Sequence, residues 1–241
     1  MWCVIVPTYN NGNSIEQVVT DILHYTRNVI VVDDGSTDCT AQILRKMGVC
    51  AVTHPHNRGK GAALKTGFRK AVEEGFTHAI TIDADGQHFA KDIPLFLEVM
   101  ERNPEAMIVG CRNLSEKNMP QKNSFANRFS NFWFMVQTGI RLPDTQTGYR
   151  LYPLKTMRIS GCITSRYEAE LELLVFAAWH GTRLIPVKIG VYYPVRRVSH
   201  FRPVYDFLRI SILNIMLCFL AVVYGYPMKF VYCIKKHRER Q

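Results

Sequence analysis

The sequence has no two cysteines spaced as a C-x-x-C pair. Its 7 cysteines are odd in number and scattered, which argues against a zinc knuckle and against a disulfide framework. We therefore expect small buried thiols in a reducing compartment. The opening run WCVIVPTYN also lacks the length and the basic start of a secretory signal, so we expect this end of the chain to be cytosolic.

Acidic residues are scarce relative to basic ones, and internal repeats and low-complexity segments are absent. The chain has 20 Asp and Glu against 30 Lys and Arg, which gives a formal net charge of +10. This excess suggests an anionic partner: nucleic acid, an acidic membrane surface or a phosphorylated substrate. Since no recognised nucleic-acid-binding motif accompanies the charge, we expect no nucleic-acid partner.

The first half of the chain alternates short apolar runs with amphipathic ones. Strands are predicted at residues 3–6, 29–32, 49–52, 79–82 and 106–110, and amphipathic helices lie between them. This alternation predicts an α/β fold, in which a mostly parallel sheet has helices on both faces. Ligands bind such sheets beyond the carboxyl ends of the strands.

Polar residues gather where three of the predicted strands end, at positions 8–10, 33–36 and 83–87. Asp83 and Asp85 are alternate residues of an extended segment, so their carboxylates can face the same way. Together with Gln87 they offer hard oxygen ligands, which suit Mg²⁺ or Mn²⁺. The alternative is a loop in which the aspartates cap a helix and the chain turns at Gly86. The preceding strand, the polar neighbours and the basic excess favour a metal.

Two further segments have both a structural and a functional interpretation. In VVDDGSTD, Asp33 or Asp34 can accept hydrogen bonds from a ribose or a base edge, or the segment can be a simple Asx turn. HNRGKGAAL is not a Walker A loop, yet Gly59 and Gly61 would let the backbone approach a ligand, and Lys60 favours phosphate. The H-x-H of His54 and His56 has no third ligand nearby, so we expect these histidines to be structural.

Taken in order, VPTYNNGNSIEQVV, VVDDGSTDCT, HNRGKGAALKTGF and TIDADGQHFAKDIP resemble the successive motifs of family-2 glycosyltransferases with the GT-A (Rossmann-like) fold. The resemblance covers roughly residues 3–200 and is closest to the dolichyl- and polyprenyl-phosphate mannosyl- or glucosyltransferases. It implies a metal-dependent, inverting hexosyltransferase with Mg²⁺ or Mn²⁺ as cofactor. The implied donor is a GDP- or UDP-sugar, and the implied acceptor is a polyprenyl phosphate such as undecaprenyl or dolichyl phosphate.

The resemblance also implies roles for individual residues. Those expected to bind the nucleotide sugar are Pro7, Tyr9, Asp33, Asp34, Lys60 and Asp83. Those expected to hold the metal are Asp83, Asp85 and Gln87. The catalytic candidates are Asp85, Asp144, Arg150 and Glu170, where Glu170 belongs to an acidic group with Glu168 and Glu172.

A basic set is expected to hold the acceptor phosphate, and it comprises Arg112, Arg128, Arg196, Arg197, His200 and Arg202. Within it, RRVSHFR resembles the phosphate-binding loop R-x-x-G-x-S-K of the same branch, although it is shorter and His200 stands where lysine is usual. A solvated basic turn is the alternative for this run.

Two other functions remain open at this point. If a hydroxyl of a growing surface glycan attacks the donor, a general base is needed, and Glu170 or Asp144 would serve. A lipid phosphate is already anionic and needs cations instead. A membrane-anchored binding module without catalysis is the second alternative, and the intact D-A-D-x-Q argues against it.

The end of the chain has a different composition. No residue between Arg209 and Lys229 is charged, and the 19 residues ISILNIMLCFLAVVYGYPM would form a helix about 28 Å long, against ~30 Å for the hydrocarbon core of a bilayer. Both flanks are basic, and the positive-inside rule favours both on the cytoplasmic side. We therefore expect a GT-A domain at residues 1–203 and a membrane-associated helical tail at residues 204–241.

The tail is predicted to be an interfacial or re-entrant helix that starts near Val204, is kinked at Gly225–Pro227 and is followed by a short second helix on the surface. A single transmembrane helix is the alternative, and a soluble core helix comes third. The expected location is the cytoplasmic face of a membrane. The sequence leaves the oligomeric state open, with a homo-oligomer among the candidates.

Overall fold

The structure is a computed structural model that describes residues 1–112, 121–157, 164–166, 168–192, 203–230 and 232, with backbone only at 121–126 and 203–209. Four residues predicted to hold the acceptor phosphate lie outside the described residues: Arg196, Arg197, His200 and Arg202. The strands are β1 (Trp2–Thr8), β2 (Val29–Asp33), β3 (Cys50–Thr53), β4 (His78–Thr81), β5 (Met107–Arg112), β6 (Arg150–Pro153) and β7 (Leu184–Ile189).

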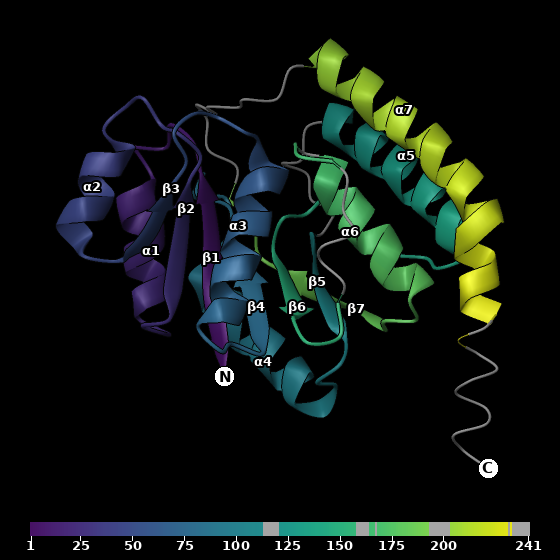
Figure 1. The fold of residues 1–241 in the computed structure, drawn as a ribbon, viewed down its shortest axis with the longest axis horizontal. Coiled ribbons are helices and arrows are strands. Elements are labelled where there is room, and N and C mark those ends of the chain that lie inside the picture. Colours follow the sequence, from purple (N-terminus) through teal and green to yellow (C-terminus); the bar gives the residue numbers. More distant parts are fainter. Residues whose placement is uncertain (113–120, 158–163, 167, 193–202, 231, 233–241) are drawn as a thin grey trace.

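Helices connect these strands and end the described chain (Figure 1). They are α1 (Ile15–Leu23), α2 (Thr40–Met47), α3 (Lys60–Glu73), α4 (Ile93–Arg102), α5 (Gln121–Thr138), α6 (Glu168–Trp179) and α7 (Pro203–Leu220). A 3₁₀ turn at Ala90–Asp92 precedes α4, and a π-helical turn at Ala221–Gly225 follows α7.

The described strands form one sheet of seven in the order β3-β2-β1-β4-β6-β5-β7. The pairs β1–β2, β1–β4, β2–β3 and β5–β7 are parallel, whereas β6 runs antiparallel to both β4 and β5. The mostly parallel α/β sheet predicted from the sequence is thus confirmed. Strand β6 was not predicted, because its four residues show no alternation and end at a proline.

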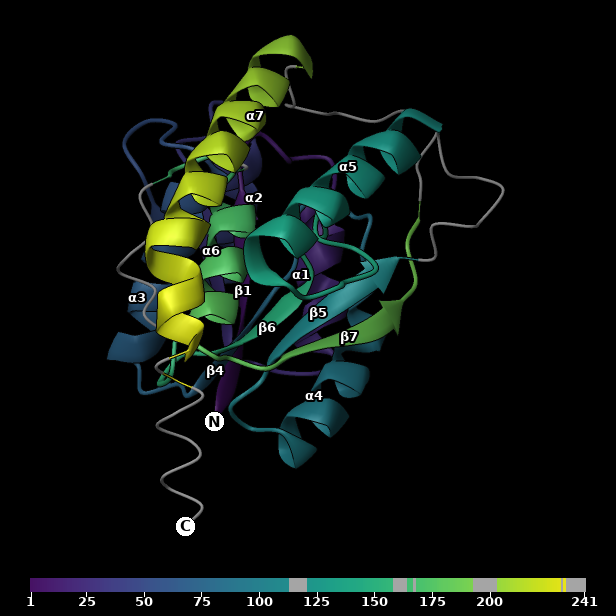
Figure 2. The ribbon, with the colours of Figure 1, turned by 90° about the vertical axis from the view of Figure 1, so that its right-hand side faces the viewer.

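Helices cover both faces of the sheet, as predicted (Figures 1 and 2). Helices α3, α5, α6 and α7 share one buried apolar cluster with the sheet, and α1, α2 and α4 share another on the opposite face. The central strands β1 and β2 are almost entirely buried. Their sequences are therefore nearly continuous apolar runs, which is typical of parallel strands covered on both faces.

The apolar tail is part of this packing. Leu213, Leu217 and Ala221 belong to the same cluster as the sheet face beneath them. The expected kink at Gly225–Pro227 is replaced by the π-helical turn, and the chain stays helical to Phe230. Proline has no N–H to donate to the preceding turn, and a π-helical turn just before it accommodates that loss. The predicted short second helix falls largely outside the described residues.

Helix α3 lies very close to β1 because Gly67 faces the sheet. A Cβ at this position would come within 2.5 Å of Ile5 Cγ2. We expect Gly67→Val to lower the free energy of unfolding by about 2 kcal/mol, since an overpacked core must shift its backbone. Urea denaturation measures this change. Glu73→Val, at an exposed position of the same helix, is the matched control and should stay within about 0.5 kcal/mol of the parent. Equal stability of the two variants would contradict the close approach.

Candidate active site

The loops that follow β1 and β2 are tied together at the carboxyl edge of the sheet. Thr8 pairs with Asp33 in the strand register. Asn10 adopts φ 52°, and its Oδ1 accepts a hydrogen bond of 2.8 Å from the Thr37 backbone N–H. The Asn10 N–H donates to Ser36 Oγ at 2.9 Å. These contacts hold the first two polar segments of the sequence side by side.

Asp33 is fully buried and carries an unused acceptor. Its Oδ1 accepts the Ser36 N–H at 3.0 Å, whereas its Oδ2 has no hydrogen-bond partner among the described residues. A buried carboxylate oxygen left without a partner costs free energy, so such an atom often marks where a ligand donates. Pro7 is buried at the end of β1, and the half-buried Tyr9 follows it.

Asp34, which the sequence placed among the nucleotide ligands, is committed to the fold. Its Oδ1 lies 2.7 Å from His54 Nδ1 and accepts the Arg58 N–H at 3.0 Å, and its Oδ2 accepts the Gly59 N–H at 2.7 Å. His54 Nε2 lies 2.9 Å from Thr66 Oγ1. The contacts bear out a structural role for His54 and show that Asp34 organises the loop before α3, while its role in nucleotide binding stays a prediction.

The glycines of that loop also serve the fold. A Cβ on Gly59 would lie 2.6 Å from the Ser165 carbonyl oxygen, and one on Gly61 would lie 2.4 Å from Ala169 Cβ. The backbone that approaches closely here is the segment leading into α6. The approach of these glycines to a ligand stays a prediction.

Lys60, Asp83 and Glu170 meet at one point, although they come from α3, the end of β4 and α6. The Lys60 ammonium lies 2.7 Å from Asp83 Oδ1 and 2.9 Å from Glu170 Oε2, and all three side chains are largely buried. Burial disfavours the charged lysine, but the two carboxylates outweigh it and raise the pKa of Lys60. Three residues that the sequence indicated separately thus form a single charged cluster.

The same cluster sets the pKa values of its acids in opposite directions. Burial would raise the pKa of Asp83, but the adjacent ammonium outweighs it and lowers that pKa. Burial raises the pKa of Glu170, and Lys60 offsets this only in part. A Cβ on Gly148 would lie 2.5 Å from Asp83 Oδ2 and 2.8 Å from Lys60 Nζ, so a side chain here would displace the pair. Gly148 was not predicted as part of the site. Its position just before a strand was the one feature of the sequence that could have pointed to it.

Asp85 and Gln87 form a local turn beside this cluster. Asp85 Oδ1 accepts the Gln87 N–H at 3.0 Å, and Asp85 Oδ2 accepts Gln87 Nε2–H at 2.6 Å. This is part of the turn that the sequence allowed as an alternative. No group of three His, Cys, Asp or Glu side chains within the described ranges could hold a metal alone. Asp83, Asp85 and Gln87 nevertheless offer only oxygen ligands, and magnesium is commonly held by one or two carboxylates plus substrate phosphates. The donor set fits Mg²⁺ or Mn²⁺.

His88, which received no role from the sequence, lies next to this turn. Its ring packs near Tyr149, with ring centroids 5.4 Å apart, and its buried Nδ1 has no hydrogen-bond partner in the described part of the chain. Burial lowers the pKa of His88 to about 4, so the ring is neutral at pH 7.

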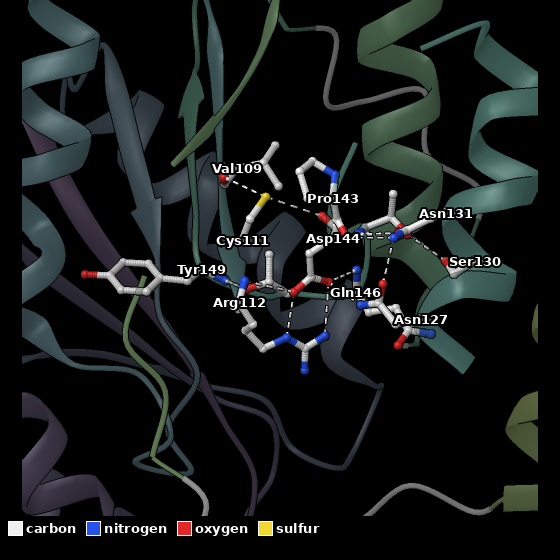
Figure 3. A network of polar contacts seen from close by, with 12 residues as sticks. Val109, Cys111, Arg112, Asn127, Ser130, Asn131, Pro143, Asp144, Gln146 and Tyr149 are labelled. Atoms are coloured by element: carbon white, nitrogen blue, oxygen red, sulfur yellow. Dashed lines mark hydrogen bonds and ion pairs between the residues drawn. The ribbon is translucent and has the colours of Figure 1, made fainter. Parts of the chain in front are cut away.

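Asp144 is the centre of a buried polar network (Figure 3). Arg112 donates from Nε to Oδ2 at 2.6 Å and from Nη2 to Oδ1 at 3.0 Å. Asn127 Nδ2 and the Gln146 N–H also donate to Oδ1, at 2.6 and 3.0 Å. Burial would raise the pKa of Asp144, but Arg112 outweighs it and lowers that pKa. Both oxygens are thus engaged by donors of the chain itself, and the catalytic role of Asp144 stays a prediction.

Arg150, the second catalytic candidate from this segment, is fully buried. Its Nη1 donates to the Glu170 carbonyl at 2.6 Å and its Nη2 to the Thr145 carbonyl at 2.9 Å. It joins the start of α6 to the segment after Asp144, and its buried Nε has no hydrogen-bond partner among the described residues. Its catalytic role stays a prediction.

The remaining predicted cations and acids are distributed as follows. Arg112 is mostly buried beside Asp144, and Arg128 is exposed on α5. Glu168 and Glu172 are buried in α6, where Glu172 Oε2 accepts the Thr164 N–H at 2.9 Å. Asn127, which helps to hold Asp144, was missed. The one feature of the sequence that could have pointed to Asn127 is that it is a polar residue in a helix rich in aromatic residues.

Comparison with known proteins gives a family match over most of the chain. The family model described as glycosyl transferase family 2 matches residues 3–173. UDP-N-acetylglucosamine–dolichyl-phosphate N-acetylglucosaminyltransferase of Methanococcus voltae is 31% identical over 210 residues, covering 77% of this chain and 84% of that protein. Polyprenol monophosphomannose synthase of Mycolicibacterium smegmatis is 25% identical over 200 residues, covering 77% and 75%.

A solved structure shares the fold. Glucosyl-3-phosphoglycerate synthase from Mycobacterium tuberculosis, in complex with Mn²⁺, UDP and phosphoglyceric acid, superposes with a TM-score of 0.64 at 19% identity and covers 92% of this chain and 78% of that one. The architecture is therefore the GT-A-like α/β fold that the sequence motifs implied.

We expect Asp144→Asn to lower the free energy of unfolding by about 3 kcal/mol at pH 7, because it leaves the Arg112 guanidinium without its buried partner. The folded pKa of Asp144 lies below the unfolded value of about 3.9, so its contribution is complete above that pH and is lost as the pH falls through the folded pKa. The difference between variant and parent should therefore shrink in acid.

Chemical denaturation at several pH values measures this effect. Asp85→Asn, at a less buried position, is the control and should change stability little. Unchanged stability of Asp144→Asn together with a loss of sugar transfer would contradict a purely structural role and support the predicted catalytic one.

Proposed function

This chain belongs to glycosyltransferase family 2, and we propose that it transfers a hexose from a GDP- or UDP-sugar to a polyprenyl phosphate, with inversion, at the cytoplasmic face of a membrane. The observation that carries the proposal is the convergence of Lys60, Asp83 and Glu170 at the carboxyl edge of the sheet. A buried cation beside two carboxylates, next to a further carboxylate and an amide, suits a bound diphosphate.

The donor is proposed to lie across the ends of β1, β2 and β4. The free Oδ2 of Asp33 would accept a hydrogen bond from the nucleoside, with Pro7 and Tyr9 beside it. An ammonium group has three donors, and two are directed at Asp83 and Glu170. Lys60 can therefore turn toward a phosphate oxygen without leaving its pocket.

A divalent cation would be held by Asp83, Asp85 and Gln87. When bound, it supplies Lewis-acid stabilisation to the departing diphosphate. The solved relative with Mn²⁺ and UDP supports a metal requirement, as does the all-oxygen donor set. Lys60 keeps Asp83 ionised and holds both carboxylates of the cluster in place.

The contacts of the acids favour a phosphate acceptor over a sugar hydroxyl. A hydroxyl needs a general base, yet Asp144 is saturated by Arg112, Asn127 and Gln146, and Glu170 is paired with Lys60. A lipid phosphate needs no base, since its oxygen is already anionic. The curated relatives named for transfer to dolichyl phosphate or for polyprenol monophosphomannose synthesis support the same choice.

The acceptor phosphate is proposed to approach from the side of β5 and α5. Arg112 lies at the end of β5, and the exposed Arg128 lies on α5. Their charges would offset the repulsion between two phosphates, which is the main electrostatic barrier to this reaction. Direct attack from the face opposite the diphosphate then inverts the anomeric centre without a covalent intermediate. The apolar helix 210–230 supports a membrane location, where such an acceptor resides.

Transfer to a lipid phosphate is the decisive test. We expect the protein in detergent, with Mn²⁺ or Mg²⁺, to transfer sugar from at least one UDP- or GDP-sugar to undecaprenyl or dolichyl phosphate. The product should be stable to mild base and labile to mild acid. Asp85→Ala and chelation of divalent cations should each abolish turnover. Activity on a saccharide with none on any lipid phosphate would reject the acceptor, and nucleotide binding without any turnover would favour the non-catalytic module.

Asp33→Ala should weaken nucleotide binding about tenfold to a hundredfold, because a hydrogen bond to a buried carboxylate contributes about 1.5–3 kcal/mol. Titration calorimetry with UDP and with GDP measures the dissociation constants and also identifies the preferred base. Asp21→Asn on α1 is the control and should bind as the parent does. Unchanged affinity of Asp33→Ala would remove this residue from the nucleotide site.

A further inference from the structure

The helix that runs from α7 through the π-helical turn to Phe230 has two distinct faces. Its inner face is buried against the catalytic domain, and it consists of Leu213, Asn214, Leu217, Ala221 and Gly225. Its outer face carries six large apolar side chains, each between 61% and 72% exposed, and they are Ile212, Ile215, Phe219, Val222, Val223 and Phe230. From 212 to 222 they recur every three or four residues, Val223 adjoins Val222, and Phe230 follows Val223 after seven residues, so that all six lie on one side of the helix.

The helix is attached to the domain from residue 213 to residue 229. Gln137 Nε2 donates to Asn214 Oδ1 at 2.9 Å, near one end. Tyr226 and Lys229, near the other end, donate to backbone carbonyls of α5. In between, Gly225 lies so close to the Trp179 indole that a Cβ would come within 2.4 Å of it. These contacts extend over residues 213–229, about 24 Å of helix.

A helix that is attached to the domain in this way cannot simply cross the bilayer. The stretch Ile210–Phe230 is long and apolar enough to cross a bilayer, with mean hydropathy 1.9. A spanning helix must be surrounded by lipid or by other membrane helices, because every polar group in the hydrocarbon must be satisfied there. Here the neighbours are α5 and α6 of the catalytic domain, whose sheet would have to enter the hydrocarbon as well.

Helix α5 extends the same surface. It packs beside α7, and Figure 2 shows the two helices next to each other on the side turned to the viewer. Phe132 and Val136 of α5 are 52% and 39% exposed. We call the outer stripe together with Phe132 and Val136 the apolar face. On the surface of a soluble protein, exposed apolar side chains are usually scattered singly, whereas here they gather in one continuous area. Such an area usually binds another molecule.

The charges around the apolar face distinguish two partners, a second copy of the chain and a lipid surface. The helix has basic residues toward both ends in the sequence. Arg202 precedes it and Arg209 lies in its N-terminal part, and the residues at or after its other end are Lys229, Lys235, Lys236, Arg238 and Arg240. A two-fold dimer would place basic ends together whether the helices ran parallel or antiparallel. An anionic bilayer attracts both ends at once.

We infer that the apolar face lies flat in the interface of a bilayer containing anionic lipid, with the helix parallel to the membrane plane and both of its ends on one side. An amphipathic helix of this kind inserts its apolar side to the depth of the headgroup and acyl boundary. The inference depends on the proposed function in one respect only, which is that the docked membrane would also contain the polyprenyl phosphate acceptor. Figure 1 shows the N-terminal end of α7 at the same end of the molecule as the carboxyl ends of the parallel strands, so the docked surface reaches toward the active-site edge.

Vesicle flotation of the full chain tests the surface. We expect binding to phosphatidylcholine vesicles that contain phosphatidylglycerol, weaker binding without phosphatidylglycerol, and further weakening by salt. Ile215→Ser/Phe219→Ser should reduce the partition coefficient about tenfold or more, because two exposed apolar side chains no longer insert. Val72→Ser is the matched control, since Val72 is 54% exposed on α3, away from the apolar face. UDP binding and thermal melting of each variant report whether it is folded.

The orientation is tested with a membrane-impermeant maleimide on sealed vesicles. The native Cys39 and Cys50 are exposed in the catalytic domain and serve as the reference. A cysteine introduced by Gln241→Cys should be labelled from the same side, without detergent. Protection of this cysteine until detergent is added would mean that the helix spans, and it would overturn the inference.

Two other results would also overturn it. Equal flotation of the double variant and of Val72→Ser would show that the apolar face does not bind lipid. A lipid-free dimer, detected by light scattering and abolished by the double variant, would assign the face to a second copy. Transfer assays with a short, detergent-dispersed polyprenyl phosphate do not require docking, so they separate failure of this inference from failure of the proposed reaction.

Discussion

A single ammonium group shared between two carboxylates joins the three parts of the candidate active site. Lys60 opens α3, Asp83 follows β4 and Glu170 belongs to α6, so their contacts fix the relative positions of three elements far apart in the sequence. Burying any one of these charges alone would cost much free energy, and the opposite charges beside it offset that cost. Gly148 leaves the space in which this pairing fits. The other polar loops are arranged around that cluster.

Some buried carboxylates of this structure use both oxygens in hydrogen bonds to the chain itself, and another has one oxygen without a partner among the described residues. Asp34 and Asp144 look like ligands, yet each has both oxygens occupied by donors of the chain itself. Asp33 stands next to Asp34 in the sequence and differs in one respect, an oxygen with no partner in the described structure. The difference matters for chemistry, because a saturated carboxylate orients its neighbours while an unsaturated one can bind a substrate.

Much of this architecture could be predicted from the sequence, since buried parallel strands and the helices between them leave clear periodic patterns. Strand β6 could not, because four residues ending at Pro153 carry no period. The cluster of polar loops could be predicted, since strand ends meet at one edge. The hydrogen-bond contacts of Asp34, Asp144 and Arg150 could not. They depend on partners such as Asn127 and Thr145, which no spacing in the sequence connects to them.

Helix α6 carries Glu170 in its first turn and Trp179 at its last residue. The first touches the lysine of the active site, and the second lies against Gly225 of the helix beneath the apolar face. Twelve residues of α-helix make a rod of about 18 Å, too short and too well packed to bend easily. One rigid element of the fold therefore connects the charged cluster at the edge of the sheet with the helix that carries the apolar face.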